Sequence, residues 1–160
     1  MSNKKVTGPI LVPVDFSASS EAALLFALDF AQSAGQSVLV LHVVHDPGSM
    51  PGYYSRALKQ KHLVRIEDGA TDMLQEFLAE VGDAHEQLFK ANQVESMLVK
   101  GVPTSRILEV AKKVSASMIV IGSQGLTGWK HLMVGSVSEQ VVRLASVPVT
   151  VVKSDKKKAG

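Results

Sequence analysis

A small set of glycine and serine positions in the C-terminal third of the chain has the types and spacing that favour phosphate binding. Gly122-Ser123-Gln124-Gly125 directly follows a short apolar run, and Gly135-Ser136-Val137-Ser138 opens a helical pattern. Glycines let backbone N–H groups approach an anion without a Cβ in the way, and the first amides of a helix have no intrahelical acceptor. Both features suit phosphate. The alternative is structural: the glycines only turn the chain, and Ser136 only caps a helix.

Other catalytic and metal-binding patterns are incomplete. The sequence contains no G-x-x-x-x-G-K-[ST] loop, no G-x-G-x-x-G after a strand and no G-x-S-x-G motif. His85-Glu86 lacks the second histidine of a zinc-protease motif, because Phe89 stands at its position. His42, His45 and Asp46 have side chains that ligate metals, but a histidine pair at a strand end with no third ligand in view is more often structural. We therefore expect neither a metal centre nor a catalytic triad.

The elements that must position these residues are short apolar runs alternating with helical patterns. Expected strands cover residues 10–14, 38–44, 95–100, 118–121 and 149–152. The first expected helix covers 22–34, with N-cap candidates Ser17, Ser19 and Ser20 and a stop at Gly35. A second covers 58–81, with Gly82 near its break, and one or two further helical turns are expected within 83–92. Two more helices are expected to begin at Pro103 and at Ser136, where the S-x-x-E spacing suggests a capping box. The first helix is apolar nearly all round and is expected to be well buried. This alternation predicts an α/β, Rossmann-like fold: a single-domain, doubly wound parallel five-stranded sheet with helices on both faces.

In open parallel sheets, ligands bind beyond the carboxyl ends of the strands, where the strand order reverses. That rule selects Pro13-Val14-Asp15 after the first strand, Val43 near the end of the second, and the segment from Gly122 to Gly135 after the fourth. Asp15 is the only acidic residue placed there. A single carboxylate beside a ribose is not a general base for phosphoryl transfer, so any hydrolysis is expected to be slow.

Composition narrows the class of protein. The chain has 160 residues, 46% of them apolar and 20% charged, which predicts one globular domain and excludes disorder over most of the length. The longest apolar stretches carry Asp29 and His42 and are shorter than the ~20 residues that span a bilayer, so no membrane partner is expected. We expect a flexible N-terminus at 1–8, a folded domain at 9–153 and a lysine-rich disordered tail at 154–160.

The charge pattern argues against nucleic acid as a partner. The formal net charge is +2, and the excess comes from lysines at the end of the chain: Lys153, Lys156, Lys157 and Lys158. The rest of the chain is close to neutral, without the basic stripe of a nucleic-acid-binding surface. There is no cysteine, and the N-terminal lysines are not followed by the apolar segment of a secretory signal. A cytoplasmic location is expected.

The sequence resembles the universal stress protein family over nearly its whole length. The segments that carry the resemblance are Val12-Pro13-Val14-Asp15-Phe16-Ser17, Gly101-Val102-Pro103, Ile119-Val120-Ile121-Gly122-Ser123-Gln124-Gly125, Gly135-Ser136-Val137 and Pro148-Val149-Thr150-Val151-Val152. The nucleotide-binding branch of that family carries glycine, two residues, glycine, nine residues, then glycine and serine or threonine. Gly122, Gly125, Gly135 and Ser136 match every position. The resemblance implies a sheet of the adenine nucleotide alpha hydrolase type.

The resemblance also implies a ligand and a set of roles. The ligand would be ATP, with Mg²⁺ or Mn²⁺, or AMP or another adenine nucleotide. Asp15 and the backbone of Pro13, Val14 and Val43 would face adenine and ribose. The phosphates would be held by Gly122, Ser123, Gln124, Gly125, Gly135, Ser136, Val137 and Ser138. The last strand, at 149–152, is expected at the sheet edge, where it would pair with a second copy in a two-fold homodimer.

Departures from the family pattern are few. Phe16 stands where many members have glycine, Ser115-Ala116-Ser117-Met118 replaces the usual acidic residue before the fourth strand, and 83–92 looks longer than usual. The function expected from the resemblance is a nucleotide-dependent regulator or protective factor in the stress response, with protein partners that the sequence does not identify. The alternatives are a dimeric interaction module of the same fold that binds no nucleotide, or a slow ATPase.

Overall fold

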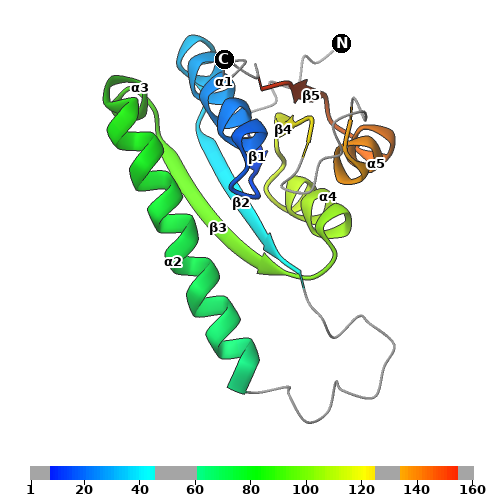
Figure 1. The fold of residues 1–160 in the computed structure, drawn as a ribbon. Helices are drawn as coiled ribbons and strands as arrows, with labels where there is room; N and C mark the ends of the chain where they lie inside the picture. The colour runs from blue at the N-terminus through cyan, green and yellow to red at the C-terminus, as the bar shows by residue number, and fades with distance from the viewer. Residues whose placement is uncertain (1–7, 46–60, 125–133, 155–160) are drawn as a thin grey trace, which may run out of the picture.

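The computed structural model describes residues 8–45, 61–124 and 134–154 (Figure 1). The strands are β1 (Ile10–Pro13), β2 (Val38–Val44), β3 (Val94–Lys100), β4 (Met118–Gly122) and β5 (Val149–Val152). The helices are α1 (Ala18–Ala34), α2 (Lys61–Ala84), α3 (Glu86–Lys90), α4 (Pro103–Lys113) and α5 (Ser136–Leu144). The predicted alternation of strands and helices is confirmed.

The strands form one parallel sheet in the order β3-β2-β1-β4-β5. The chain builds outward from β1 through β2 to β3, then crosses back to place β4 on the other side of β1, with Ile10 opposite Met118 and Leu11 opposite Ile119. The strand order therefore reverses between β1 and β4. This confirms the doubly wound topology and puts the switch point between these two strands.

Two apolar cores lie on opposite faces of the sheet. On one face, strand residues such as Val12 and Val40 pack against Leu24 and Leu28 of α1 and Phe77 of α2. On the other, residues such as Leu11 and Ile121 pack against Ile107 of α4 and Val141 of α5. Figure 1 shows α2 on one side of the sheet and α4 and α5 on the other. Because both faces are covered there, β1, β2 and β4 read as nearly continuous apolar runs in the sequence. The edge strand β3 instead carries the exposed residues Glu95, Ser96 and Lys100.

Helix α1 ends at the predicted glycine but begins at Ala18, four residues before the predicted range, with the first of the three candidate serines as its N-cap. Ser17 is its N-cap, and its side chain accepts a hydrogen bond from the Ser20 amide; Gly35 ends it in the left-handed conformation, at φ 64°. The prediction that α1 is well buried is wrong for one side of the helix. Phe26 and Phe30 are 43% and 42% exposed and stack on each other, with ring centroids 6.4 Å apart.

Helix α5 begins at Ser136, as predicted, but its cap differs from the prediction. Its N-cap is Gly135, with no side-chain capping hydrogen bond, so the capping box predicted at Ser136 is wrong. Ser138 Oγ instead donates to the Gly122 carbonyl over 2.7 Å. The serine at the third helical position is thus used in a tertiary contact that joins α5 to the end of β4.

Helix α2 continues through Gly82, the predicted break, and ends at Ala84. The short α3 then folds back, placing the Phe89 ring 3.6 Å from where a Cβ on Gly82 would lie. This accounts for the segment at 83–92 as one helical turn, as the sequence suggested. None of the helices in the described part of the chain combines the length and apolarity of a membrane span.

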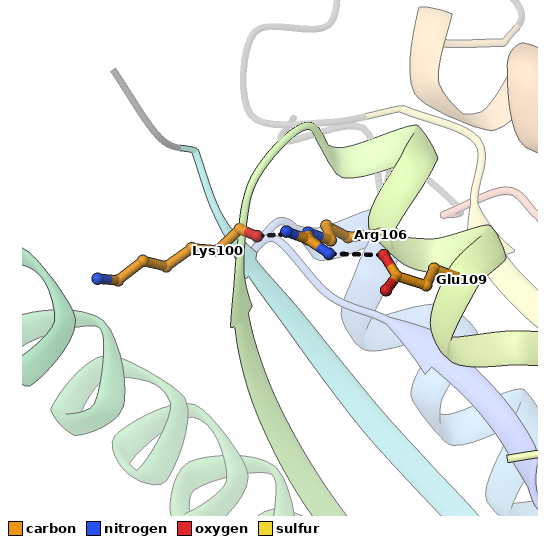
Figure 2. A network of polar contacts seen from close by, with 3 residues as sticks. All are labelled: Lys100, Arg106 and Glu109. Atoms are coloured by element: carbon orange, nitrogen blue, oxygen red, sulfur yellow. Dashed lines mark hydrogen bonds and ion pairs between the residues drawn. The ribbon is translucent and has the colours of Figure 1, made fainter. Parts of the chain in front are cut away.

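A tight corner joins β3 to α4. Gly101 has φ 136°, and a Cβ there would lie 2.7 Å from Arg106 Nε. The Arg106 side chain occupies the space beside Gly101 (Figure 2). Its Nε donates to the Lys100 carbonyl over 2.7 Å, and the same guanidinium pairs with Glu109 over 2.6 Å. Pro103 then opens α4 at its first turn, as predicted. This contact explains the Gly101-Val102-Pro103 motif structurally.

The predicted flexible ends fall mostly outside the described residues, and the domain bounds remain a prediction. Gly8 lies against α4's end, since a Cβ there would meet the Ser115 carbonyl oxygen at 1.8 Å. At the other end, Ser154 Oγ lies 3.3 Å from Ser19 Oγ. Residues 1–7 and 155–160 are not described.

Candidate functional site

The carboxyl end of β4 and the start of α5 are joined by two hydrogen bonds. The Gly135 amide donates to the Ser123 carbonyl over 2.6 Å, and Ser138 Oγ donates to the Gly122 carbonyl over 2.7 Å. The first turn of α5 therefore lies beside the turn that follows β4. The structure thus brings together Gly122, Ser123 and the segment 135–138, for which the sequence analysis proposes phosphate contacts.

The donors available for an anion at this place come from α5 rather than from Ser123. The Ser123 amide donates to the Val152 carbonyl over 2.8 Å, and its carbonyl accepts from Gly135, so both backbone groups are engaged. The amides of Ser136, Val137 and Ser138 lie in the first helical turn and have no intrahelical acceptor. Ser136 is exposed, whereas Ser138 is buried. The positive end of the α5 dipole adds to this preference for an anion.

Gly122 has a packing role that the sequence did not reveal. A Cβ at this position would lie 2.6 Å from the carbonyl carbon and 2.7 Å from the carbonyl oxygen of Ser19. The first turn of α1 thus rests directly on the end of β4. The close approach at Gly122 in this structure is between two parts of the chain itself.

Asp15 follows β1, and its carboxylate is oriented by the N-cap of α1. Oδ1 accepts from the Ser17 amide at 3.1 Å and from Ser17 Oγ at 2.5 Å. Ser17 Oγ also lies 3.4 Å from the Gln124 carbonyl. Ser17 therefore connects the turn after β1 with the turn after β4. The sequence predicts only a capping role for Ser17; the signal that could have indicated its contact with Asp15 is the Asp-x-Ser spacing, which is typical of an Asx turn.

The remaining predicted positions lie at the end of β1 and on β2. Pro13 pairs in register with Leu41, and the Val14 amide donates to the Leu41 carbonyl over 2.8 Å. Val43 pairs with Val99 of β3 and packs partly buried on the face covered by α4. The carboxyl ends of β1 and β2, next to the turn after β4, are therefore lined by Pro13, Val14 and Val43. Gly125 lies outside the described residues.

His42 is used structurally. Its Nδ1 lies 2.8 Å from the Val14 carbonyl oxygen, which requires Nδ1 to carry the proton because a carbonyl only accepts. Its ring also lies against the ring of Phe16, with centroids 4.4 Å apart and the two planes tilted by 31°. Asp46, the third member of the metal cluster considered from the sequence, is not described. Over 8–45, 61–124 and 134–154, no three or more histidine, aspartate or glutamate side chains come together.

Phe16, which replaces the glycine common in the family, holds the backbone conformation that glycine adopts readily. Its φ is 66°, in the left-handed region that costs a bulky residue roughly 1–2 kcal/mol. The ring contacts His42 and also Phe77 of α2, whose centroid is 5.6 Å away. The aromatic contacts offset the backbone strain and connect the turn at Asp15 to α2.

The left-handed backbone at Phe16 predicts that a glycine variant at this position is more stable than an alanine variant. Phe16→Ala and Phe16→Gly both lose the ring, but only glycine relieves the strain, so Phe16→Gly is expected to be more stable than Phe16→Ala by about 1 kcal/mol. Urea unfolding of both variants measures the difference. An alanine variant as stable as the glycine variant would show that the left-handed backbone at Phe16 carries no strain.

The fold and the site together define a class of protein. It is a doubly wound α/β protein of the Rossmann-like kind, with a glycine-bearing turn and a helix N-terminus at its switch point. The model of the universal stress protein family matches residues 7–153, and the chain belongs to this family.

Relatives agree over nearly the whole chain. Universal stress protein YxiE of Bacillus subtilis is 32% identical over 149 residues, which cover 90% of this chain and 97% of that protein. The structure of universal stress protein UspA from Lactobacillus plantarum matches with a TM-score of 0.65 at 27% identity, covering 91% of this chain and 97% of that one. A universal stress protein from Archaeoglobus fulgidus, solved in complex with dAMP, matches with a TM-score of 0.63 at 25% identity, covering 92% and 99%.

Proposed function

We propose that this chain binds an adenine nucleotide, ATP in particular, at the carboxyl edge of the sheet between β1 and β4. The observation that carries the proposal is the pair of hydrogen bonds from Gly135 and Ser138 to the turn after β4. They hold the first turn of α5, with its amides that have no intrahelical acceptor, at the switch point where α/β sheets bind ligands. The dAMP complex of the Archaeoglobus fulgidus relative supports an adenine nucleotide as the ligand.

Each part of the nucleotide has a proposed contact. The amides of Ser136, Val137 and Ser138, together with the segment from Gly122 to Gly125, hold the phosphates. The Asp15 carboxylate, already oriented by Ser17, accepts a hydrogen bond from a ribose hydroxyl. Pro13, Val14 and Val43 border the adenine. Mg²⁺ or Mn²⁺ would accompany ATP mainly through the phosphates, since Mg²⁺ sites of this kind use few protein ligands.

The proposed role is that of a nucleotide-dependent regulator or protective factor in the stress response. ATP bound across the turns after β1 and β4 would favour one conformation of these two turns. The surface that they present to protein partners would change as a result. The chain contains no cysteine, which fits a reducing compartment such as the cytoplasm.

We also propose a homodimer through β5. In the described sheet β5 pairs only with β4, and its residues are half-buried. Its other side therefore presents backbone donors and acceptors that a second copy of the strand can pair with in a two-fold arrangement. The edge position of β5 was predicted from the sequence.

A thermal titration tests nucleotide binding. The purified protein is denatured, and any nucleotide that it releases is identified by mass. The protein is then refolded without nucleotide, and its thermal unfolding is followed at increasing ATP concentrations. Ligand at about 100 times Kd should stabilise the protein by roughly 2.7 kcal/mol. A saturable shift is expected. No copurified nucleotide and no shift would favour the interaction module, whereas release of phosphate or AMP above background would favour the slow ATPase.

A further inference from the structure

Helix α5 is short, and its position depends on the contacts that it makes with its neighbours. It has 9 residues, of which Ser138 and Val141 are buried. Isolated helices shorter than about 12–15 residues are marginal in water, so α5 needs the packing around it. The amides proposed to hold the phosphates lie in its first turn, at 136–138. Whatever holds α5 in place therefore also places these amides.

Two side-chain hydrogen bonds hold the start of α5 from opposite sides. Ser138 Oγ donates to the Gly122 carbonyl, at the end of β4, over 2.7 Å. Gln140 Oε1 accepts from Thr104 Oγ1, in the first turn of α4, over 2.9 Å. Neighbouring residues of an α-helix are about 100° apart around its axis, so the side chains of Ser138 and Gln140 leave α5 about 200° apart. The helix is thus bonded to the sheet on one side and to α4 on the other.

The first turn of α4, which carries Thr104, is itself anchored to the ends of two strands. The Gly101 amide donates to the Val44 carbonyl, at the end of β2, over 3.0 Å. Arg106 Nε donates to the Lys100 carbonyl, at the end of β3, over 2.7 Å (Figure 2). The hydroxyl of Thr104 therefore has a defined position relative to the carboxyl ends of the strands.

The Thr104 hydroxyl is used between helices and not as a cap of its own helix. Val102 is the N-cap of α4, and no side chain caps it. Thr104 is only 6% exposed, and a buried hydroxyl needs a hydrogen-bond partner, which the exposed Gln140 supplies. Without this bond, the amide group of Gln140 can still bond to water. The main effect that we expect from the contact is therefore on the placement of α5.

We propose that Thr104 is a positioning residue of the phosphate site, which acts through Gln140 to hold the amides of 136–138 where the phosphates bind. This inference rests on the nucleotide site proposed above and deepens it. It adds a role in ligand binding to the corner formed by Gly101-Val102-Pro103. The contact acts on α5 and not on Asp15, which faces the ribose in the proposed site. Thr104 should therefore favour nucleotides that carry phosphates over the bare nucleoside.

The test uses the full chain with Thr104→Val, which removes the hydroxyl and keeps the branched shape of the side chain. Calorimetry measures the Kd of ATP and of adenosine for the nucleotide-free protein. ATP binding should weaken about 3- to 10-fold, the effect of one hydrogen bond, while adenosine binding changes less than about 2-fold. Thr104→Ser restores the hydroxyl and should bring the ATP affinity back to within about 2-fold of the unchanged protein.

A second variant approaches the same contact from the exposed side. Gln140→Ala removes the partner of Thr104 and should weaken ATP binding to a similar extent. Combined with Thr104→Val it should cause little further loss, because both changes remove one interaction. Thr71→Val is the matched control, since Thr71 is exposed on α2 and its hydroxyl bonds only locally, to the Glu67 carbonyl. It should change neither Kd.

A measurement without nucleotide separates this inference from the proposed function. In the isotope-labelled, nucleotide-free protein, Thr104→Val should shift the amide resonances of 136–138, and Thr104→Ser should leave them close to their original positions. The inference is overturned if Thr104→Val keeps the ATP affinity, if it weakens ATP and adenosine equally, or if Thr104→Ser loses as much as Thr104→Val; the nucleotide site then stands. If the unchanged protein binds neither ATP nor adenosine, the proposed function fails, and this inference fails with it.

Discussion

Gly135→Val is expected to remove ATP binding while the protein stays folded. Gly135 is the N-cap of α5, with φ −72° and ψ 159°, an extended conformation that valine adopts without strain. The added side chain would stand at the entrance to the first-turn amides of α5, where a phosphate must come within hydrogen-bond distance. We expect the ATP affinity to fall at least about 100-fold, since several charge-assisted hydrogen bonds are lost together. Stability should fall by about 1 kcal/mol, because valine is a poorer N-cap than glycine.

The measurement is calorimetric titration of ATP, with circular dichroism to confirm the fold. Gly69→Val is the matched control: Gly69 is exposed within α2, and a Cβ there meets nothing within 4 Å. It adds the same side chain far from the switch point and should leave the ATP affinity unchanged. A folded Gly135→Val protein that binds ATP as tightly as the unchanged protein would show that α5 does not hold the phosphates.

Gly122→Ala is expected to destabilise the fold by about 3 kcal/mol, the upper part of the range for an overpacked core position. The new Cβ would lie 2.6–2.7 Å from the backbone of Ser19, which no rotation of a side chain can relieve. The first turn of α1 would have to move away from β4. Urea unfolding measures the loss of stability.

Gly82→Ala is the control for a glycine with room beside it. A Cβ at Gly82 would make ordinary contact with the Phe89 ring at 3.6 Å, so alanine should be neutral or stabilise α2 by up to about 1 kcal/mol. If Gly122→Ala were as stable as the unchanged protein, the glycine would not be needed for packing. Because Gly122 has this structural role, loss of ATP binding in its variants would not identify a ligand contact. Gly135 is therefore the better position for testing the site.

The three central strands, β1, β2 and β4, were predictable because most of their residues are buried on both faces of the sheet. Runs such as those ending at Pro13 and Val44 contain almost only apolar residues, and Gly35 and Pro103 mark a helix end and a helix start by their own backbone preferences. These signals are local, so they can be read without the structure. The sequence therefore predicted the element order and the edge position of β5.

The errors in the fold come from contacts between distant parts of the chain. The S-x-x-E spacing at Ser136 has the form of a capping box, but Gly135 is the N-cap and Ser136 is the first residue of α5, while Ser138 bonds to Gly122, sixteen positions earlier. Similarly, the apolar composition of α1 predicted burial all round, whereas Phe26 and Phe30 are 43% and 42% exposed. Local patterns do not reveal which side of a helix meets the sheet.

The sequence predicted which positions lie near the switch point, but not the contacts that they make there. The switch-point rule and the family motif selected Asp15, Gly122 and the segment from Gly135, which the structure brings to one edge. The contact of Gly122 with Ser19 and the bridge from Ser17 to Gln124 depend on tertiary packing, which spacing does not encode. The left-handed backbone at Phe16 has no signal in the chain's own spacing, since phenylalanine rarely adopts a positive φ.

The most direct test of the central claim is to follow the backbone amides of the isotope-labelled protein by NMR as ATP is added. Binding at the carboxyl ends of the strands predicts saturable chemical-shift changes that are largest at the amides of Asp15, Ser123 and residues 136–138. Little change is expected at α3, which lies at the amino ends of the strands. Shifts that never saturate, or that centre on α3 and the amino ends of the strands, would contradict nucleotide binding at the switch point.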